Sequence, residues 1–224
     1  FPYMGMFLPP LYGDQTWGSF VRAKNRSWKK PWIVSVDMME EYCRGMRENG
    51  FHVLSYFNVT EFGAGIEWPP PPRKTEKEED LWKDANDFLY SNLADAILFA
   101  PDKQMPVRGI GYYSIEPGDP YVTWERALAM DPADPAYQAH LLNQARRHVE
   151  ELPSSSGICI DRMDWLRFYN HRADDGVSWF GDQAVRSLNT SWHGLMDQLA
   201  PIFHDAGKLL YVNNHVKRID LLNH

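Results

Sequence analysis

Two carboxylates follow a short apolar segment in the second half of the chain. Gly157-Ile-Cys-Ile160 leads into Asp161, and Asp164 stands three residues later. Four residues of this kind between a serine-rich turn and a carboxylate are typical of a buried parallel strand. In parallel sheets, ligands bind at the carboxyl ends of the strands. A carboxylate there can act as a nucleophile or as a general acid or base, so Asp161 and Asp164 are the predicted catalytic residues.

Polar and aromatic residues follow other predicted strands in the same way. They carry flat rings that can stack on a ligand, or groups that can hydrogen-bond to one. The predicted binding residues are Asn58, Glu61, Trp165, Arg167, Tyr169, Asn213, Asn214 and His215. Trp124 and Trp179 are weaker candidates for the same role. The alternative for each is structural, because loop aromatics can anchor a loop to the core and a polar run can complete a turn.

Apolar segments alternate with helical patterns along the chain, which predicts βαβ units and a parallel sheet. Strands are expected at Tyr3–Leu8, Phe51–Phe57, Gly157–Ile160 and Lys208–Asn213. A third strand, in chain order, is either Ala96–Ala100 or Ile110–Tyr113, and periodicity does not choose between them.

Helices are expected where capping residues precede an apolar stripe. One spans Val36–Glu48 behind Ser35, with Met38, Met39, Tyr42 and Met46 as its stripe and Gly50 as its stop. The others span Thr75–Tyr90 behind a capping box, Pro135–Leu152 behind Asp134, and Ser191–Ala206, kinked or restarted at Pro201 and ended by Gly207.

Five strands joined by helical crossovers fit either a doubly wound sheet or an incomplete barrel. No glycine-rich phosphate loop follows any strand, and the long loops stand after strand ends, which favours the barrel. A complete barrel typically needs about 250 residues. We therefore expect an α/β fold, an incomplete TIM-type (β/α) barrel of about five β/α units, forming one domain over residues 1–224. Either the barrel closes in an unusual way or the chain has been cut before a sixth strand.

The stretch Met130-Asp-Pro-Ala-Asp-Pro135, the helix after it, and the strand ending in Asp161-Arg-Met-Asp164-Trp165 resemble the α-galactosidase-like superfamily of retaining glycoside hydrolases. In that superfamily a D-x-x-(N/D)-P segment begins a helix that leads into a strand ending in the nucleophilic aspartate. The resemblance covers about Met130 to Asn214 and extends to uncharacterised bacterial proteins of sugar-hydrolase type. It implies that Asp161 is the nucleophile of a hydrolase acting on an oligo- or polysaccharide.

Several alternatives stay open. A longer strand would move the nucleophile from Asp161 to Asp164, and Asp161 can instead pair with Arg162 or cap the following turn. A retaining enzyme needs a second carboxyl group about 5 to 5.5 Å from the nucleophile. The resembling enzymes supply it from the sixth strand, and the candidates within this chain are Glu61, Glu67, Glu116 and Asp119. Without that group, the chain is alternatively a non-catalytic carbohydrate-binding barrel.

Other functional classes are disfavoured by what the sequence lacks. The eight histidines show no His-x-His pattern for a metal-dependent barrel hydrolase, and no Gly-x-Ser-x-Gly elbow occurs. Cys43 and Cys159 have no metal-site spacing and are expected to be buried. We therefore predict no metal and no cofactor.

Charge and hydropathy limit the partners further. The net charge of -7 disfavours nucleic acid, and no apolar run approaches the roughly 20 residues that cross a bilayer. A carbohydrate is the expected partner. The chain begins at Phe1 without a basic leader region, so a soluble protein, secreted or periplasmic with its leader removed, fits the sequence, but localisation is not fixed.

Overall fold

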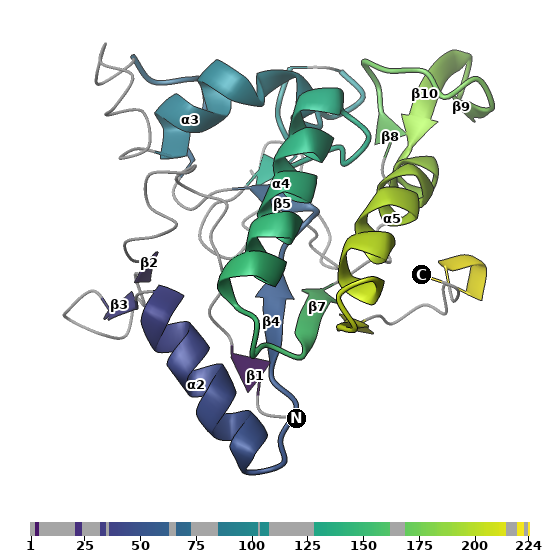
Figure 1. Cartoon of the computed structure of the whole chain (residues 1–224). Coiled ribbons are helices and arrows are strands. Elements are labelled where there is room, and N and C mark those ends of the chain that lie inside the picture. The colour runs from purple at the N-terminus through teal and green to yellow at the C-terminus, as the bar shows by residue number, and fades with distance from the viewer. Residues whose placement is uncertain are drawn as a thin grey trace.

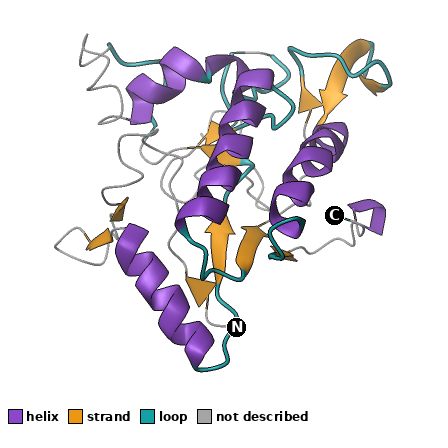
Figure 2. Cartoon of the chain, viewed as in Figure 1, coloured by secondary structure: helices purple, strands orange, loops and turns teal. Residues whose placement is uncertain are grey.

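A parallel sheet forms the centre of the described structure. The computed structural model describes residues 3–4, 21–23, 32–34, 36–62, 66–72, 85–102, 104–107, 128–161, 169–213, 219–221 and 224. The four-stranded sheet has the order β1 (Tyr3–Met4), β4 (Leu54–Phe57), β7 (Gly157–Asp161) and β11 (Leu209–Asn213). Every pairing in it is parallel. Helices α4 and α5 lie across it (Figures 1 and 2).

Helix α4 (Pro135–Glu151) begins where the sequence predicts it. The Asp134 carboxylate accepts hydrogen bonds from the amides of Ala136, at 3.1 Å, and Tyr137, at 3.0 Å. Pro135 occupies the first helical position, where a backbone amide would have no partner within the helix, so its lack of an amide hydrogen costs nothing. The apolar side of the helix faces inward, where Tyr137, Leu141 and Ala145 are buried, and Leu152 is buried just after its end.

Helix α5 (Leu188–His204) begins three residues before the predicted Ser191. The reason is a cap that pattern reading missed, since the Ser187 hydroxyl accepts from the amide of Asn189 at 3.2 Å. The helix continues through Pro201, so the predicted restart there is wrong. Gly207, with φ of 66°, ends the helix region as expected.

One face of the sheet packs against α4 and α5. Phe57, Ile158 and Ile160 are buried there in one cluster with helical residues including Trp192, Leu195 and Phe203. Burying each such side chain stabilises the fold by about 1.5–3 kcal/mol. Alternate residues along the strands occupy the opposite face, where Tyr211 is 50% exposed.

Helix α2 (Val36–Glu48) has the predicted bounds, and Gly50 follows it with φ of 83°. Its buried residues differ from the prediction, because Val36, Met39 and Cys43 face inward while Tyr42 is 42% exposed. Cys43 and Cys159 are both buried, as predicted, and neither forms a disulfide. Burial, followed by the nearby Glu40 charge, raises the pKa of the Cys43 thiol to about 11.

A closed barrel is not confirmed. Among the described strands, β4 pairs directly with β7 and β7 pairs with β11, so Gly157–Asp161 is third in this sheet and not the predicted fourth barrel strand. Ile97 and Phe99, from the predicted Ala96–Ala100 strand, form single antiparallel bridges with Met130 and Pro106 instead. Ile110–Tyr113 lies outside the described residues. The described sheet is open, with β1 and β11 at its edges.

Smaller elements surround the sheet. β8 (Tyr169–Asn170), β10 (Gln183–Ser187) and β9 (Ser178–Phe180) form an antiparallel sheet in that order. β5 (Glu61–Phe62) pairs with β6 (Leu128–Ala129), and β2 (Val21–Ala23) pairs with β3 (Trp32–Val34). The predicted Thr75–Tyr90 helix is described only as α3 (Ala85–Asn92), and its capping box lies outside the described residues. Short 3-10 helices occur at η2 (Ala94–Ala96) and η4 (Ile219–Leu221).

Candidate functional site

Three predicted site residues lie at the carboxyl edge of the parallel sheet. The register makes Asp161, at the end of β7, the direct partner of Asn213, at the end of β11. On the other side, Phe57 of β4 pairs with Ile160, so Asn58 follows the neighbouring strand immediately. The backbone therefore brings these residues together from three distant parts of the sequence.

The opposite end of β7 fixes this register. Gly157 has φ of 145°, and a Cβ atom placed there would lie 1.9 Å from the carbonyl oxygen of Leu209. Only glycine lets the β7 and β11 backbones approach so closely. The Lys208 ammonium group, largely buried, donates to the carbonyls of Leu152, Pro153 and Ser155 at 3.0, 3.2 and 2.7 Å. These contacts join the end of α4 to the starts of β7 and β11.

Asn58 and Glu61 form a turn after β4. The Asn58 Oδ1 atom accepts from the Glu61 amide at 3.2 Å, so this side chain stabilises the turn. Glu61 is half-buried. Burial, and then the charge of Glu61, raises the pKa of Tyr137, whose hydroxyl donates to the Val59 carbonyl at 2.7 Å. Glu61 is thus a half-buried carboxylate close to the end of a central strand.

Tyr169 lies in the antiparallel sheet that follows β7. Its ring centroid is 5.8 Å from that of Phe180 and 6.5 Å from that of His171. These contacts give it a packing role on that sheet. Of the other predicted residues, Asp164, Trp165, Arg167, Asn214 and His215 lie outside the described residues, as do Glu116 and Asp119.

Asp131 is a buried residue that is not among the predicted site residues. Its Oδ2 atom accepts from Asn170 at 2.8 Å and from Arg186 at 3.2 Å, and its Oδ1 atom accepts from Ser191 at 2.6 Å. The carboxylate thereby joins β8, β10 and α5 to the segment before α4. Its position in the D-x-x-(N/D)-P segment was the available signal, but spacing alone does not reveal partners that lie up to 60 residues away.

The described part of the chain offers no metal centre. No group of three or more His, Cys, Asp or Glu side chains within it could hold a metal ion. Likewise, none of its helices is long and apolar enough to cross a membrane.

Comparison with known proteins gives a distant likeness. No protein-family model matches the chain, and no curated protein matches it in sequence. Its structure is similar to the glycoside hydrolase domain of PelA from Pseudomonas aeruginosa and to a variant of that domain, with 18% identity and TM-scores of 0.44 and 0.46. Each comparison covers 82% of this chain and 50% of the other, so the chain spans about half the length of these domains. At this level, the likeness assigns no function.

Proposed function

We propose that the chain is a glycoside-hydrolase-type domain in which Asp161 is the nucleophile of a retaining reaction. The observation that carries the proposal is the pairing of Asp161 with Asn213 at the carboxyl end of β7, an interior strand of the parallel sheet. An interior strand is held by hydrogen bonds on both sides, which favours precise placement of a reacting group.

In the proposed reaction, the Asp161 carboxylate attacks the anomeric carbon as the glycosidic bond breaks, and an acid delivers a proton to the leaving oxygen. Water then attacks the same carbon of the glycosyl ester and releases the sugar, while the acid's conjugate base takes the proton from water. Asn213, beside Asp161, is suited to hydrogen-bond a sugar hydroxyl.

Glu61 is the acid/base that we favour among the described carboxylates. It follows β4, the neighbour of β7, and it is half-buried, whereas Glu67 is exposed. The alternative source of the acid is a sixth strand, from which the resembling enzymes supply it.

The test of Asp161 is covalent trapping. Incubation with 2-deoxy-2-fluoroglycosyl fluorides, whose fluoride leaves without acid assistance, should label the peptide that contains Asp161. Asp161→Asn should abolish the label, and Asp164→Asn should retain it. Asp205→Asn, at an exposed carboxylate after α5, is the matched control. Label on another residue, or turnover without any label, would refute the assignment. Saccharide binding with neither turnover nor label would favour the non-catalytic carbohydrate-binding domain.

The role of Glu61 requires a separate comparison of leaving groups. Glu61→Gln should lower kcat by about 10²- to 10⁴-fold for glycosides with alkoxide leaving groups, and much less for glycosyl fluorides. Glu67→Gln is the matched control in the same part of the chain. Equal losses on both substrate types would show that Glu61 does not act as the acid.

A further inference from the structure

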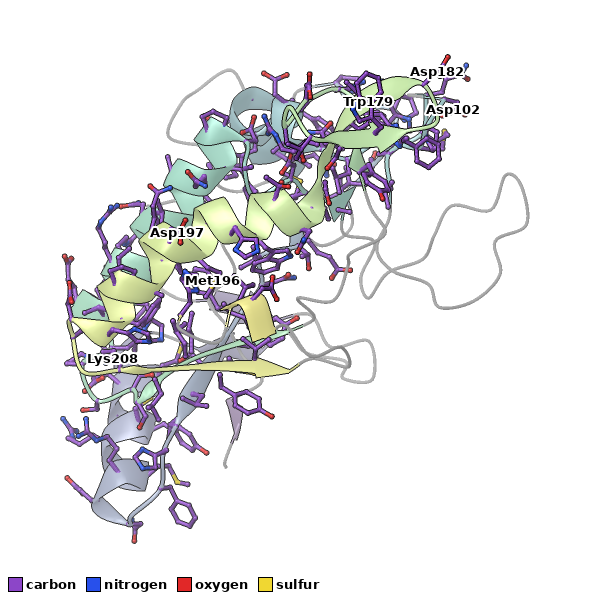
Figure 3. The ribbon with its side chains drawn as sticks, turned by 90° about the vertical axis from the view of Figure 1, so that its right-hand side faces the viewer. Asp102, Trp179, Asp182, Met196, Asp197 and Lys208 are labelled. Carbon is purple, nitrogen blue, oxygen red and sulfur yellow. The ribbon has the colours of Figure 1, made fainter. Side chains whose placement is uncertain are left out.

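Three exposed apolar side chains lie on the segment between β7 and α5. Val177, Trp179 and Phe180 are 74%, 64% and 45% exposed. Trp179 of β9 is the cross-strand partner of Ala184 of β10, so the two share one face of the β8–β10–β9 sheet, which we call the ribbon. Phe180 lies on the other face, where its ring centroid is 4.9 Å from that of His171. Trp179 projects at one end of the molecule (Figure 3).

The strand that carries Trp179 is held at its start by hydrogen bonds from backbone amides. The Asp175 carboxylate accepts from the amides of Val177, at 3.1 Å, Ser178, at 2.7 Å, and Ser187, at 2.9 Å. Burial acts to raise the pKa of Asp175, but the hydrogen bonds from these amides outweigh it and lower that pKa. These contacts join the start of β9, which carries Trp179, to the end of β10.

The base of the same ribbon is fixed to the body of the protein. Arg186 of β10 and Asn170 of β8 both donate to the buried Asp131 carboxylate. The Gln183 side chain also donates to the His171 carbonyl at 2.7 Å. The β8–β10–β9 sheet that carries Trp179 is thus fixed, through Asp131, to the segment before α4.

The exposed charges at this end of the molecule disfavour an anionic ligand. Asp174 and Asp182 are exposed on the same ribbon, and Asp102 lies at the same end of the molecule (Figure 3). The guanidinium of Arg172 stacks 3.5 Å from the Phe99 ring centroid, and Arg186 already binds Asp131. Exposed carboxylates repel phosphates and acidic sugars, while they accept hydrogen bonds from hydroxyl groups.

We propose that Trp179 is a stacking subsite for an uncharged oligosaccharide. The apolar face of a pyranose would lie on the indole ring, with its hydroxyl groups directed at the neighbouring carboxylates. This inference rests on the proposed function, since it places a further unit of the same carbohydrate on the segment that begins at Asp161. It names the ligand as a neutral saccharide chain, and not a second protein or an anionic polymer.

The test measures binding independently of cleavage. The protein is labelled with 5-fluorotryptophan, and the fluorine resonance of Trp179 is assigned, among those of the nine tryptophans, by its loss in Trp179→Phe. Cellohexaose, maltohexaose, N-acetylchitohexaose and anionic hexagalacturonate are then titrated. At least one neutral probe should shift the Trp179 resonance, and hexagalacturonate should not. Trp179→Ala should weaken that binding by about tenfold or more, while Trp179→Phe retains most of it.

Tyr42→Ala is the matched control, because Tyr42 is an exposed aromatic residue on α2. It should leave the affinity unchanged. Circular dichroism and the urea midpoint establish that each variant is folded. A Trp179 resonance unmoved by every neutral probe would overturn the subsite, as would a response only to hexagalacturonate. Loss of a dimer in Trp179→Ala without any change in saccharide affinity would make this surface a self-association site instead.

Failure of the subsite is distinguishable from failure of the proposed function. Fluoroglycosyl trapping uses a single sugar unit and needs no contact with Trp179. Label on Asp161 combined with an unresponsive Trp179 would retain the nucleophile and reject the subsite.

Discussion

Acid should destabilise the protein through one buried histidine. The His148 side chain on α4 has no solvent exposure, and neither of its ring nitrogens has a hydrogen-bond partner among the described residues. It packs at 5.6 Å, centroid to centroid, from the Phe203 ring. Burial, and then the nearby charge of Lys208, lowers the pKa of His148 to about 3.

The sign and size of the effect follow from linkage. In the unfolded chain a histidine has a pKa of about 6.5, so at pH 5 the unfolded state binds a proton that the folded state does not. Above about pH 6.5 the histidine is neutral in both states and does not reduce the free energy of unfolding. As the pH falls from there toward about 3, the unfolded state takes up the proton and the free energy of unfolding decreases. Between pH 7 and pH 5 this single group should cost about 2 kcal/mol, approaching about 1.4 kcal/mol per pH unit.

The assay is urea unfolding at pH 7, 6 and 5 for the wild type and for His148→Leu. The loss of stability between pH 7 and pH 5 should be smaller by about 2 kcal/mol in the variant. His204→Leu makes the same change at an exposed position and is the matched control. Identical pH dependence in the wild type and His148→Leu would refute the reasoning, whatever the variant's stability at pH 7.

Further substitutions test the contacts around the sheet, each by its urea midpoint. Gly157→Ala should cost more than about 4 kcal/mol or prevent folding, because its Cβ would overlap the Leu209 carbonyl, whereas Gly50→Ala, in open space with φ of 83°, should cost about 1 kcal/mol. Asp131→Ala leaves buried donors unpaired and should cost about 3–5 kcal/mol. Lys208→Met removes the donor from three carbonyls and should cost about 1–3 kcal/mol.

The elements predicted correctly are those whose signals are local. Asp134 and Pro135 mark the start of α4, and the spacing of apolar residues after them indicates its buried face. Both features could therefore be predicted without knowing any distant contact. The strand Gly157–Asp161 was predictable for the same reason, because a short apolar run between a turn and a carboxylate is typical of a buried strand.

Predictions failed where several local solutions exist and tertiary contacts choose between them. Both Tyr42 and Cys43 fit a helical stripe on α2, and packing buries Cys43. Ile97 fits a strand of the sheet, but β4 and β7 pair with each other directly. The β9–β10 hairpin was available from the sequence, since Gly181-Asp182 between two β-forming segments is a two-residue turn signal that was overlooked.

The position of the candidate site, at the carboxyl edge of the parallel sheet, could be predicted from the sequence. Residues after parallel strands converge at one edge, which is why Asp161 and Asn213 were predicted together before their register was known. Their chemical roles remain predictions, because reactivity depends on carboxylate separation and protonation, and spacing along the chain determines neither.

The exposed side of β11 has a practical consequence for handling the protein. Among the described strands β11 pairs with β7 alone, and Leu209 and Tyr211 on it are 48% and 50% exposed. A strand that pairs on one side only within the described part of the chain, and that carries exposed apolar side chains, can act as a template for another strand, including one from a second molecule. Concentrated solutions should therefore tend to aggregate through β11, and Tyr211→Lys is a suitable first choice for a more soluble crystallisation sample.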